Sequence, residues 1–386
     1  MTTNNNRNKI PNVPNLRFPE FKEEWKESRL GDVVYFSKER IFSSELNNDN
    51  YISTENMLQD FNGITVSKNI PLNVSVFAYA KGDTLLSNIR PYLKKVWKAD
   101  RNGGCSSDVF VIKANTIICN KDFAYYLIAN ECFISYVMCG TKGVKMPRGD
   151  KEQMKLYKIS YPTIKEQQKI ANLFNLLDER IETQSKIIED LKTLINGVRS
   201  YIFTHQNNCS KHSLGDFLTE YSERNREKQL PSVAVGKYGI RKREEIYSKE
   251  LSNDYSNNKI IYKDTLTIGM GSSQIDIGIL LDDVEYCVSP AYTTYKIHDI
   301  NSVYLQEYLK LINPILSFKY MITSVRQGKS VNKEELMQHK IFVCSSIEQK
   351  AIEQKFSAFY KKLEIEQNLL NALVSQKKYL LQQMFI

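Results

Sequence analysis

One helical pattern occurs twice in this chain. Residues 164–181 read IKEQQKIANLFNLLDERI, and residues 347–363 read IEQKAIEQKFSAFYKKL. Their Glu-Gln pairs begin at Glu166 and Glu348, which lie 182 positions apart (348 minus 166), close to half of the 386-residue length. A repeat of this spacing predicts a duplicated architecture in which each half of the chain ends in the same long helix.

Apolar residues in each copy follow one another at alternating steps of three and four, the pattern of a coiled-coil contact. A polar residue interrupts the pattern at Gln184 and, equivalently, at Glu366. We therefore expect the two helices to pack antiparallel, with Gln184 and Glu366 close together near their middles. The alternative is that each helix packs only on its own domain. The predicted contact residues, called the seam below, are Ile170, Phe174, Leu177, Ile181, Gln184, Ile188, Leu191, Ile195, Val198 and Ile202, with Ile352, Phe356, Phe359, Leu363, Glu366, Leu370, Leu373, Leu380 and Met384.

The repeat continues outside the helices. A Leu-Gly-Asp triplet at Leu30 returns at Leu214, and GDKEQMKLYKISYP (149–162) corresponds to VNKEELMQHKIFV (331–343) just before each helix. The helices keep their pattern while the interiors of the two modules differ. Such a difference predicts two similar domains that recognise different things.

Each module mixes two kinds of pattern. β-branched and aromatic runs such as VFVIK (109–113) predict strands, whereas DFAYYLIANECFISYVM (122–138) predicts helix. We expect an α+β fold, in which two globular domains with approximate twofold symmetry are separated by two long antiparallel coiled-coil helices. The expected parts are a flexible arm (1–15), a first domain (16–162), a central helix (163–206), a second domain (207–345) and a C-terminal helix (346–386).

The composition limits the class of protein. A hydrophobic content of 42% allows buried cores, and the apolar runs fall far short of the ~20 residues of a membrane span. The polar start MTTNNNRNKIPNVPN is unlike a secretory signal, so we expect a cytoplasmic protein. Seven cysteines without a C-x-x-C motif predict reduced thiols. The formal charge of +9 permits a polyanionic partner.

Catalytic and cofactor motifs fail at particular residues. RQGKS (326–330) contains the Gly-Lys-Ser of a phosphate loop, but Thr323 stands where the first glycine is required. GMGSSQ (269–274) has Gln274 in place of the third glycine of a dinucleotide-binding motif. The sequence lacks the Asn/Asp-Pro-Pro-Tyr/Phe signature of adenine methyltransferases, and its four histidines are scattered. We therefore expect no catalytic, cofactor-binding or metal-binding residues. The alternative is an acid–base enzyme whose site consists of Asp and Glu residues without a recognisable motif.

Two variable modules, each followed by a long helix, resemble the specificity subunit of type I restriction–modification systems. The resemblance runs from about Leu16 to the end of the chain. It rests on RFPEF and a following tryptophan before RLGDVVYF, on YPTIKEQQKIANLF (161–174), and on the second Glu-Gln helix opening. One difference is that the second helix opens as SSIEQKAIEQ (345–354), without a counterpart of Pro162.

The resemblance implies two target recognition domains for a two-part sequence in double-stranded DNA. It implies that the helices form a spacer on which two methyltransferase subunits dock, and that restriction (motor-nuclease) subunits join them. The chain would be non-catalytic and hold no cofactor. S-adenosylmethionine would belong to the methyltransferase, and ATP and Mg to the restriction subunit, for N6-adenine methylation or cleavage of unmodified DNA. The alternative is a two-module protein-binding scaffold with a coiled-coil spacer.

Reading DNA requires cations for phosphates and Arg, Lys, Asn, Gln or Ser for base edges. Such residues cluster in three loops at matching places of both modules, and GKYGIRKR adds to the second. For any single residue a solvated surface charge is the ordinary explanation, so the hypothesis rests on the recurrence. The first-domain candidates are Ser37, Lys38, Arg40, Ser87, Asn88, Arg90, Lys94, Lys95, Thr141, Lys142, Lys145 and Arg148. The second-domain candidates are Arg224, Asn225, Arg226, Lys237, Tyr238, Arg241, Lys242, Arg243, Ser272, Ser273, Gln274, Arg326, Gln327, Lys329 and Ser330.

Overall fold

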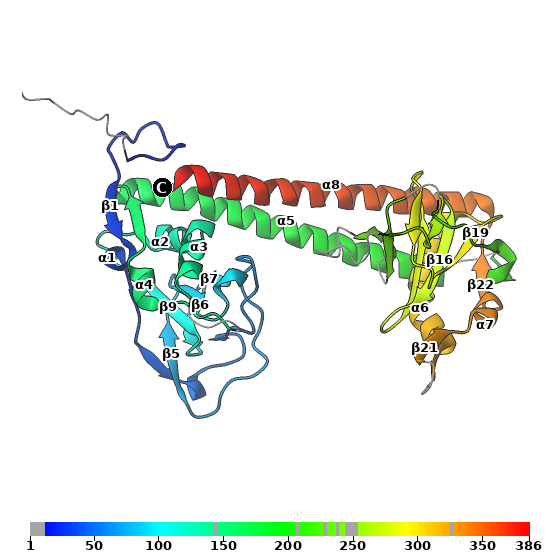
Figure 1. The fold of residues 1–386 in the computed structure, drawn as a ribbon, viewed down its shortest axis with the longest axis horizontal. Coiled ribbons are helices and arrows are strands. Elements are labelled where there is room, and N and C mark those ends of the chain that lie inside the picture. Colours follow the sequence, from blue (N-terminus) through cyan, green and yellow to red (C-terminus); the bar gives the residue numbers. More distant parts are fainter. Residues whose placement is uncertain are drawn as a thin grey trace, which may run out of the picture. The chain divides into compact units, whose positions relative to one another are not determined.

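The chain divides into two compact units in a computed structural model (Figure 1). Unit 1 contains residues 1–185 and 369–386, and unit 2 contains residues 186–368. The two long helices, α5 (Ile164–Thr204) and α8 (Ser346–Met384), each contribute to both units. The structure describes residues 12–141, 146–205, 209–226, 230–236, 239–243, 254–324 and 328–386.

The globular part of unit 1 is built on two four-stranded sheets. One is antiparallel and has the order β2 (Val34–Phe36), β9 (Val109–Ala114), β6 (Thr84–Ser87), β7 (Val96–Lys98). The other has the order β3 (Arg40–Phe42), β5 (Ser75–Tyr79), β8 (Gly103–Cys105), β4 (Tyr51–Ile52). A further pair joins β1 (Lys26–Arg29) to β10 (Lys158–Tyr161). The helices are α1 (Leu30–Val33), α2 (Lys121–Ile128), α3 (Glu131–Cys139) and α4 (Lys151–Lys155).

The globular part of unit 2 repeats this plan. Its four-stranded sheet has the order β12 (Leu218–Tyr221), β19 (Thr293–Ile297), β16 (Thr265–Met270), β17 (Ile275–Leu280). Paired strands are β11 (Ser210–Ser213) with β22 (Lys340–Val343), β13 (Val233–Gly236) with β14 (Gly239–Lys242), β15 (Lys259–Ile261) with β18 (Tyr286–Val288), and β20 (Met321–Ser324) with β21 (Gly328–Val331). The helices are α6 (Ser302–Tyr320) and α7 (Lys333–Met337).

The two domains share a strand order. The sequence β2-β9-β6-β7 in unit 1 matches β12-β19-β16-β17 in unit 2, element for element along the chain. Among the described residues of unit 2, the counterpart of the second sheet of unit 1 consists of β15 and β18, flanked by single bridges at Arg224 and Ser232. Both domains are therefore α+β, as predicted, and the duplication includes the strand topology.

Antiparallel helix pairing is present within each unit. In unit 1 the beginning of α5 meets the end of α8, where Asp178 and Lys377 form an ion pair of 2.5 Å. In unit 2 the end of α5 meets the beginning of α8, where Ile195, Ile352 and Phe356 belong to one apolar cluster. The helices also pack on their own domains, because that cluster includes residues of α6. All the predicted seam residues are buried or half-buried.

The two polar seam residues are buried, although their side chains are hydrophilic. Gln184 is 6% exposed and belongs to unit 1, whereas Glu366 is 8% exposed, belongs to unit 2 and is paired with Lys362. The proximity of Gln184 and Glu366 stays a prediction. Within the described residues, none of the helices is both long and apolar enough to cross a bilayer.

Buried glutamines explain why both long helices open with Glu-Gln. Gln167 Nε2 donates to the carbonyl oxygen of Pro162 at 2.9 Å, and Gln349 Nε2 donates to that of Cys344 at 2.8 Å. Because the acceptor is a backbone carbonyl, the second helix begins in the same way without a proline. The Oε1 of each glutamine accepts a hydrogen bond from the backbone N–H of an asparagine, at 2.8 Å in both units. Those asparagines are the N-caps of α2 and α6.

The expectation of reduced thiols is wrong for one pair, because Cys209 and Cys344 form a disulfide. Antiparallel pairing of β11 with β22 places Ser210 opposite Val343, so the residues just beyond this pair are brought together. The remaining cysteines are free, and Cys132 and Cys139 are exposed. The bond closes a loop that contains the second domain.

Candidate nucleic-acid interface

Three cations meet aromatic side chains in a cavity of about 360 Å³ in the first domain. The cations are Lys38, Arg40 and Lys151, called the first basic corner below. The Arg40 guanidinium carbon lies 4.8 Å from the ring centroid of Phe77, and Lys151 Nζ lies 4.8 Å from that of Phe36. Cations combined with aromatic faces suit a nucleic acid, because they offer contacts to phosphates and to bases.

The arginine of this corner is held in a defined position. Arg40 lies in β3 and pairs in register with Phe77. Its Nε donates to Ser75 Oγ at 3.0 Å, and its Nη2 donates to the Ser75 carbonyl oxygen at 2.6 Å. The side chain nevertheless remains exposed. A guanidinium fixed along one edge and open to solvent is prepared to bind a phosphate without a large loss of side-chain entropy.

Lys151 is the first residue of α4. The side chain of the N-cap residue, Asp150, accepts hydrogen bonds from the backbone N–H groups of Glu152 and Gln153. Partial burial lowers the pKa of the Lys151 ammonium, and repulsion from Lys155 and Lys38 lowers it further. An anion bound in the corner would relieve that repulsion. Lys151 was not among the residues proposed from the sequence. The sequence does contain a signal for Lys151, because this residue aligns with Lys333 in the repeated segments GDKEQ and VNKEE.

The second domain has a matching arrangement, called the second basic corner: Arg224, Lys259 and Lys333. The backbones of Arg224 and Lys259 form an isolated antiparallel β-bridge, and Arg224 Nη1 donates to the carbonyl oxygen of Asn257 at 2.6 Å. As in the first domain, this carbonyl belongs to the residue two positions before the arginine's strand partner. Partial burial lowers the pKa of Lys259, followed by repulsion from Lys333 and Arg224. Lys333 begins α7 as Lys151 begins α4.

Two further candidate loops of the first domain meet each other. Gly149 N donates to the Asn88 carbonyl oxygen at 3.1 Å, and Arg90 N donates to the Pro147 carbonyl oxygen at 2.8 Å. Arg148 extends from the same loop to Asp108 at 3.4 Å. Arg90 and Arg148 are exposed, so these loops add two arginines to one surface of the domain.

Three candidates are buried and maintain loop conformations. Ser37 Oγ accepts from Glu39 N at 3.2 Å, and Ser87 Oγ donates to the Ile89 carbonyl oxygen at 3.1 Å. Asn225 is 1% exposed and donates to the backbone carbonyl oxygens of Leu230 and Tyr255. The fold therefore uses these three candidate side chains internally.

Two lysine candidates point toward protein groups. Lys94 pairs with Glu131 at 3.0 Å, and Lys95 Nζ donates to the Thr54 carbonyl oxygen at 2.6 Å. Thr141 Oγ1 donates to the Met138 carbonyl oxygen at 3.0 Å, at the end of α3. These three residues lie apart from the first basic corner.

The other second-domain candidates lie on exposed turns and strand ends. Lys329 Nζ donates to the Ser272 carbonyl oxygen at 2.8 Å, which joins β21 to the turn between β16 and β17. That contact brings together the candidates of these two segments, Ser272, Ser273, Gln274, Lys329 and Ser330. Arg226, Arg241 and Lys242 are exposed, and Arg243 is half-buried. Lys142, Lys145, Lys237, Tyr238, Arg326 and Gln327 lie outside the described residues.

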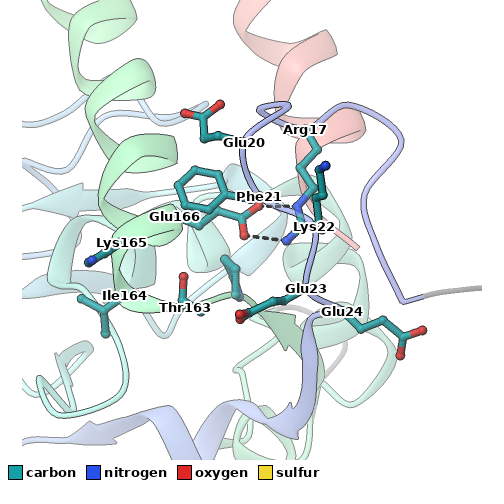
Figure 2. A pocket seen from close by; sticks show the side chains of 11 residues that line it. Arg17, Glu20, Phe21, Lys22, Glu23, Glu24, Thr163, Ile164, Lys165 and Glu166 are labelled. Atoms are coloured by element: carbon teal, nitrogen blue, oxygen red, sulfur yellow. Dashed lines mark hydrogen bonds and ion pairs between the residues drawn. The ribbon is translucent and has the colours of Figure 1, made fainter.

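A second cavity, of about 430 Å³, has a different character (Figure 2). Its central contact is a buried ion pair, in which Arg17 Nε and Nη2 donate to both oxygens of Glu166 at 2.7 and 2.8 Å. Trp25 Nε1 also donates to Glu166, at 3.3 Å. The lining carries Glu20, Glu23 and Glu24 together with Lys22 and Lys165, so its charge is mixed, unlike that of the first basic corner. The Arg17–Glu166 ion pair in this cavity attaches the RFPEF segment to the start of α5.

Side chains that could together hold a metal ion are not gathered in the described part of the chain. Groups of three or more His, Cys, Asp or Glu residues with metal-binding geometry are missing there. The geometry of the described residues supports binding through cations, and both domains present it.

Comparisons with known proteins agree with the duplicated architecture. A family described as "Type I restriction modification DNA specificity domain" matches residues 22–193 and again residues 210–375. The chain is similar to the type I restriction–modification system S subunit from M. genitalium, with a TM-score of 0.60, 16% identity, and coverage of 97% of this chain and 99% of that one. It is also similar to a chain from a study of complex assembly and conformational transition of the type I R-M system, with a TM-score of 0.58, 18% identity, and coverage of 93% and 97%. At these identities the likeness concerns the fold. No curated protein matches the chain.

Proposed function

Since this chain belongs to the family of type I restriction modification DNA specificity domains, we propose that it selects the DNA target of a type I restriction–modification complex. Each domain contacts one part of a bipartite sequence, and the chain itself is non-catalytic. The observation that supports this proposal most strongly is the pair of basic corners, in which an arginine and a lysine at the start of a helix recur at equivalent positions. One such cluster is an ordinary surface feature, whereas two in register favour one polyanion contacted twice.

Within each corner the residues have different roles. Arg40 and Arg224, fixed by backbone carbonyls, bind phosphates and set the position of each domain on the duplex. Other exposed arginines of the candidate segments, such as Arg90, Arg148 and Arg241, are the proposed readers of base edges. Base reading by a bidentate arginine discriminates by ~1–3 kcal/mol per position.

The outer faces of the helices are the docking surface for methyltransferase subunits. In unit 2, α5 exposes Ile187, Leu194 and Tyr201 at intervals of seven residues, beside the seam. In unit 1, α8 exposes Val374 and Tyr379. An apolar stripe outside an already paired coiled coil suits a further helix from a partner protein.

The chemistry of the complex belongs to the partners. Two methyltransferase subunits bring S-adenosylmethionine and methylate adenine at N6, and restriction subunits bring ATP and Mg for the cleavage of unmodified DNA. This chain positions them on double-stranded DNA.

Binding of duplex DNA as a function of salt tests the proposal. The chain, assembled with its methyltransferase, is titrated with a random-sequence duplex between 50 and 200 mM salt. A contact with about six phosphates predicts a loss of affinity of roughly 10³-fold over that range. Affinity that is low and independent of salt would contradict DNA recognition and favour a protein-binding scaffold.

A further inference from the structure

A tyrosine–carboxylate pair joins the first domain to its long helix. Tyr126, on α2, is fully buried, and its hydroxyl lies within hydrogen-bond distance of two acceptors on α5, Asp178 Oδ2 at 2.8 Å and Asn175 Oδ1 at 2.9 Å. The same carboxylate receives an ion pair from Lys377 of α8 at 2.5 Å. One half-buried carboxylate therefore connects the domain helix with both long helices of unit 1.

The second domain has the same connection with the partners exchanged. Glu307, on α6, is fully buried and accepts from the hydroxyl of Tyr360 on α8 at 2.9 Å. Arg199 of α5 pairs with this carboxylate at 2.8 Å, and Lys310 does so at 2.8 Å. Again the domain helix is connected with both long helices of its unit.

The exchange concerns equivalent positions. Tyr126 lies six residues after the N-cap of α2, and Glu307 lies six residues after the N-cap of α6. Asp178 and Tyr360 each lie eleven residues after the buried glutamine that starts their helix. The tyrosine belongs to the domain in unit 1 and to the long helix in unit 2. The hydrogen bond is thus kept while the residue types change places.

Each pair is placed to control an angle. The contact lies where the domain helix crosses the long helices, and it is separate from the basic corners in β3, α4 and their counterparts. A hydrogen bond to a charged group tolerates little displacement, because its strength falls steeply as the geometry departs from linear. An apolar contact at the same place would permit the domain to rotate on the helices.

We propose that the two tyrosine–carboxylate pairs are positioning residues that fix the angle of each recognition domain on its helix pair, and so set the gap between the two DNA half-sites. This inference rests on the proposed function for its consequence in DNA, but not for the angle itself. Neither pair is among the residues proposed to contact DNA.

An exchange of residues provides the sharpest test. Tyr126→Phe and Asp178→Asn each weaken the pair in unit 1, whereas Tyr126→Glu combined with Asp178→Tyr copies the arrangement of unit 2. A carboxylate at position 126 would be near cations, because Lys98 Nζ and Lys377 Nζ lie 5.9 and 5.8 Å from the Tyr126 ring centroid. The matched control is Tyr35→Phe, which removes the hydroxyl of an exposed tyrosine on β2 of the same unit.

The first measurement uses the assembled complex and a set of duplexes in which the gap between half-sites varies by single base pairs. The wild type and the control should prefer one gap. Each single variant should reduce that preference roughly tenfold, the effect of losing a hydrogen bond to a charged group, and the double exchange should restore it. Single variants that melt at a lower temperature but keep the gap preference would overturn the proposal, as would an exchange that fails to restore it.

The second measurement reads the angle without DNA. Spin labels introduced through noncanonical amino acids at the exposed positions Lys81 and Glu182, both in unit 1, report the distance between the domain and α5. The distance distribution should broaden in Tyr126→Phe and narrow again in the double exchange. An unchanged distribution would overturn the proposal. If the distribution changes as expected but the wild type shows no sequence-specific binding at any gap, the proposed function fails and the positioning role stands.

Discussion

Glu166 and Glu348 occupy the same place in the two copies of the long-helix motif, yet their surroundings differ. Glu166 is 1% exposed and binds Arg17 through both oxygens, whereas Glu348 is exposed and accepts from Ser345 N at 3.1 Å as a helix cap. The buried pair raises the pKa of Arg17, chiefly through its hydrogen bond to Glu166. At the residue scale, identical residues at equivalent positions of a repeat therefore have different roles, and the burial of the side chain decides which role each one has.

Lys151 provides a prediction at this scale. Lys151→Ala should weaken the binding of all duplex sequences alike and reduce the slope of log affinity against log salt by about 1, because one phosphate contact is lost. The measurement is a salt titration of the assembled complex by fluorescence anisotropy.

Lys81→Ala removes an exposed lysine on another turn of the same domain and serves as the control. Should both variants retain the wild-type slope, or should Lys151→Ala change the preferred sequence, the assignment of Lys151 to a phosphate is wrong.

The helices α5 and α8 begin in the same way because each buries a glutamine between two backbone groups. Gln349 satisfies the N–H of Asn301 and the carbonyl oxygen of Cys344, and Gln167 does the same in unit 1. Pro162 is thus dispensable for this junction. At the scale of elements, the side chain that links the domain to the helix start is what recurs.

Replacing Gln349 tests this account. Gln349→Leu leaves two backbone groups without partners, so the free energy of unfolding should fall by about 2–4 kcal/mol. Urea denaturation of the chain gives the value, and Gln354→Leu, an exposed position on the same helix, is the control. Equal midpoints for the two variants would refute the role of the buried glutamine.

For the whole molecule, the length of the helices limits the DNA target. The 41 residues of α5 extend over ~60 Å at 1.5 Å per residue. At 3.4 Å per base pair, such a spacer reaches across at most ~18 base pairs. We expect two short recognised blocks with an unread gap shorter than this limit. Mapping methylated adenines in genomes with and without the gene checks it, since a longer gap, or a motif that persists after deletion, contradicts the spacer role.

Much of the architecture follows from the sequence. The seam, the two Glu-Gln openings and the repeated Leu-Gly-Asp segments predict two α+β domains and two long helices. These predictions succeed because apolar periodicity and capping depend on neighbours within a few turns. The equivalence of Arg40 and Arg224 was predictable for a related reason, since their offset of 184 matches that of the strands preceding them, whereas their contact with DNA stays a prediction.

Tertiary structure alone decided the rest. Whether Ser37, Ser87 and Asn225 face solvent depends on loop closure, and the disulfide of Cys209 with Cys344 depends on the register of two strands far apart in sequence. The exchanged tyrosine–carboxylate pairs cannot be predicted from sequence periodicity, because the residue types differ at each equivalent position and only the contact between them is shared. Local patterns specify elements, but the meeting of side chains distant in sequence depends on the packing of those elements against one another.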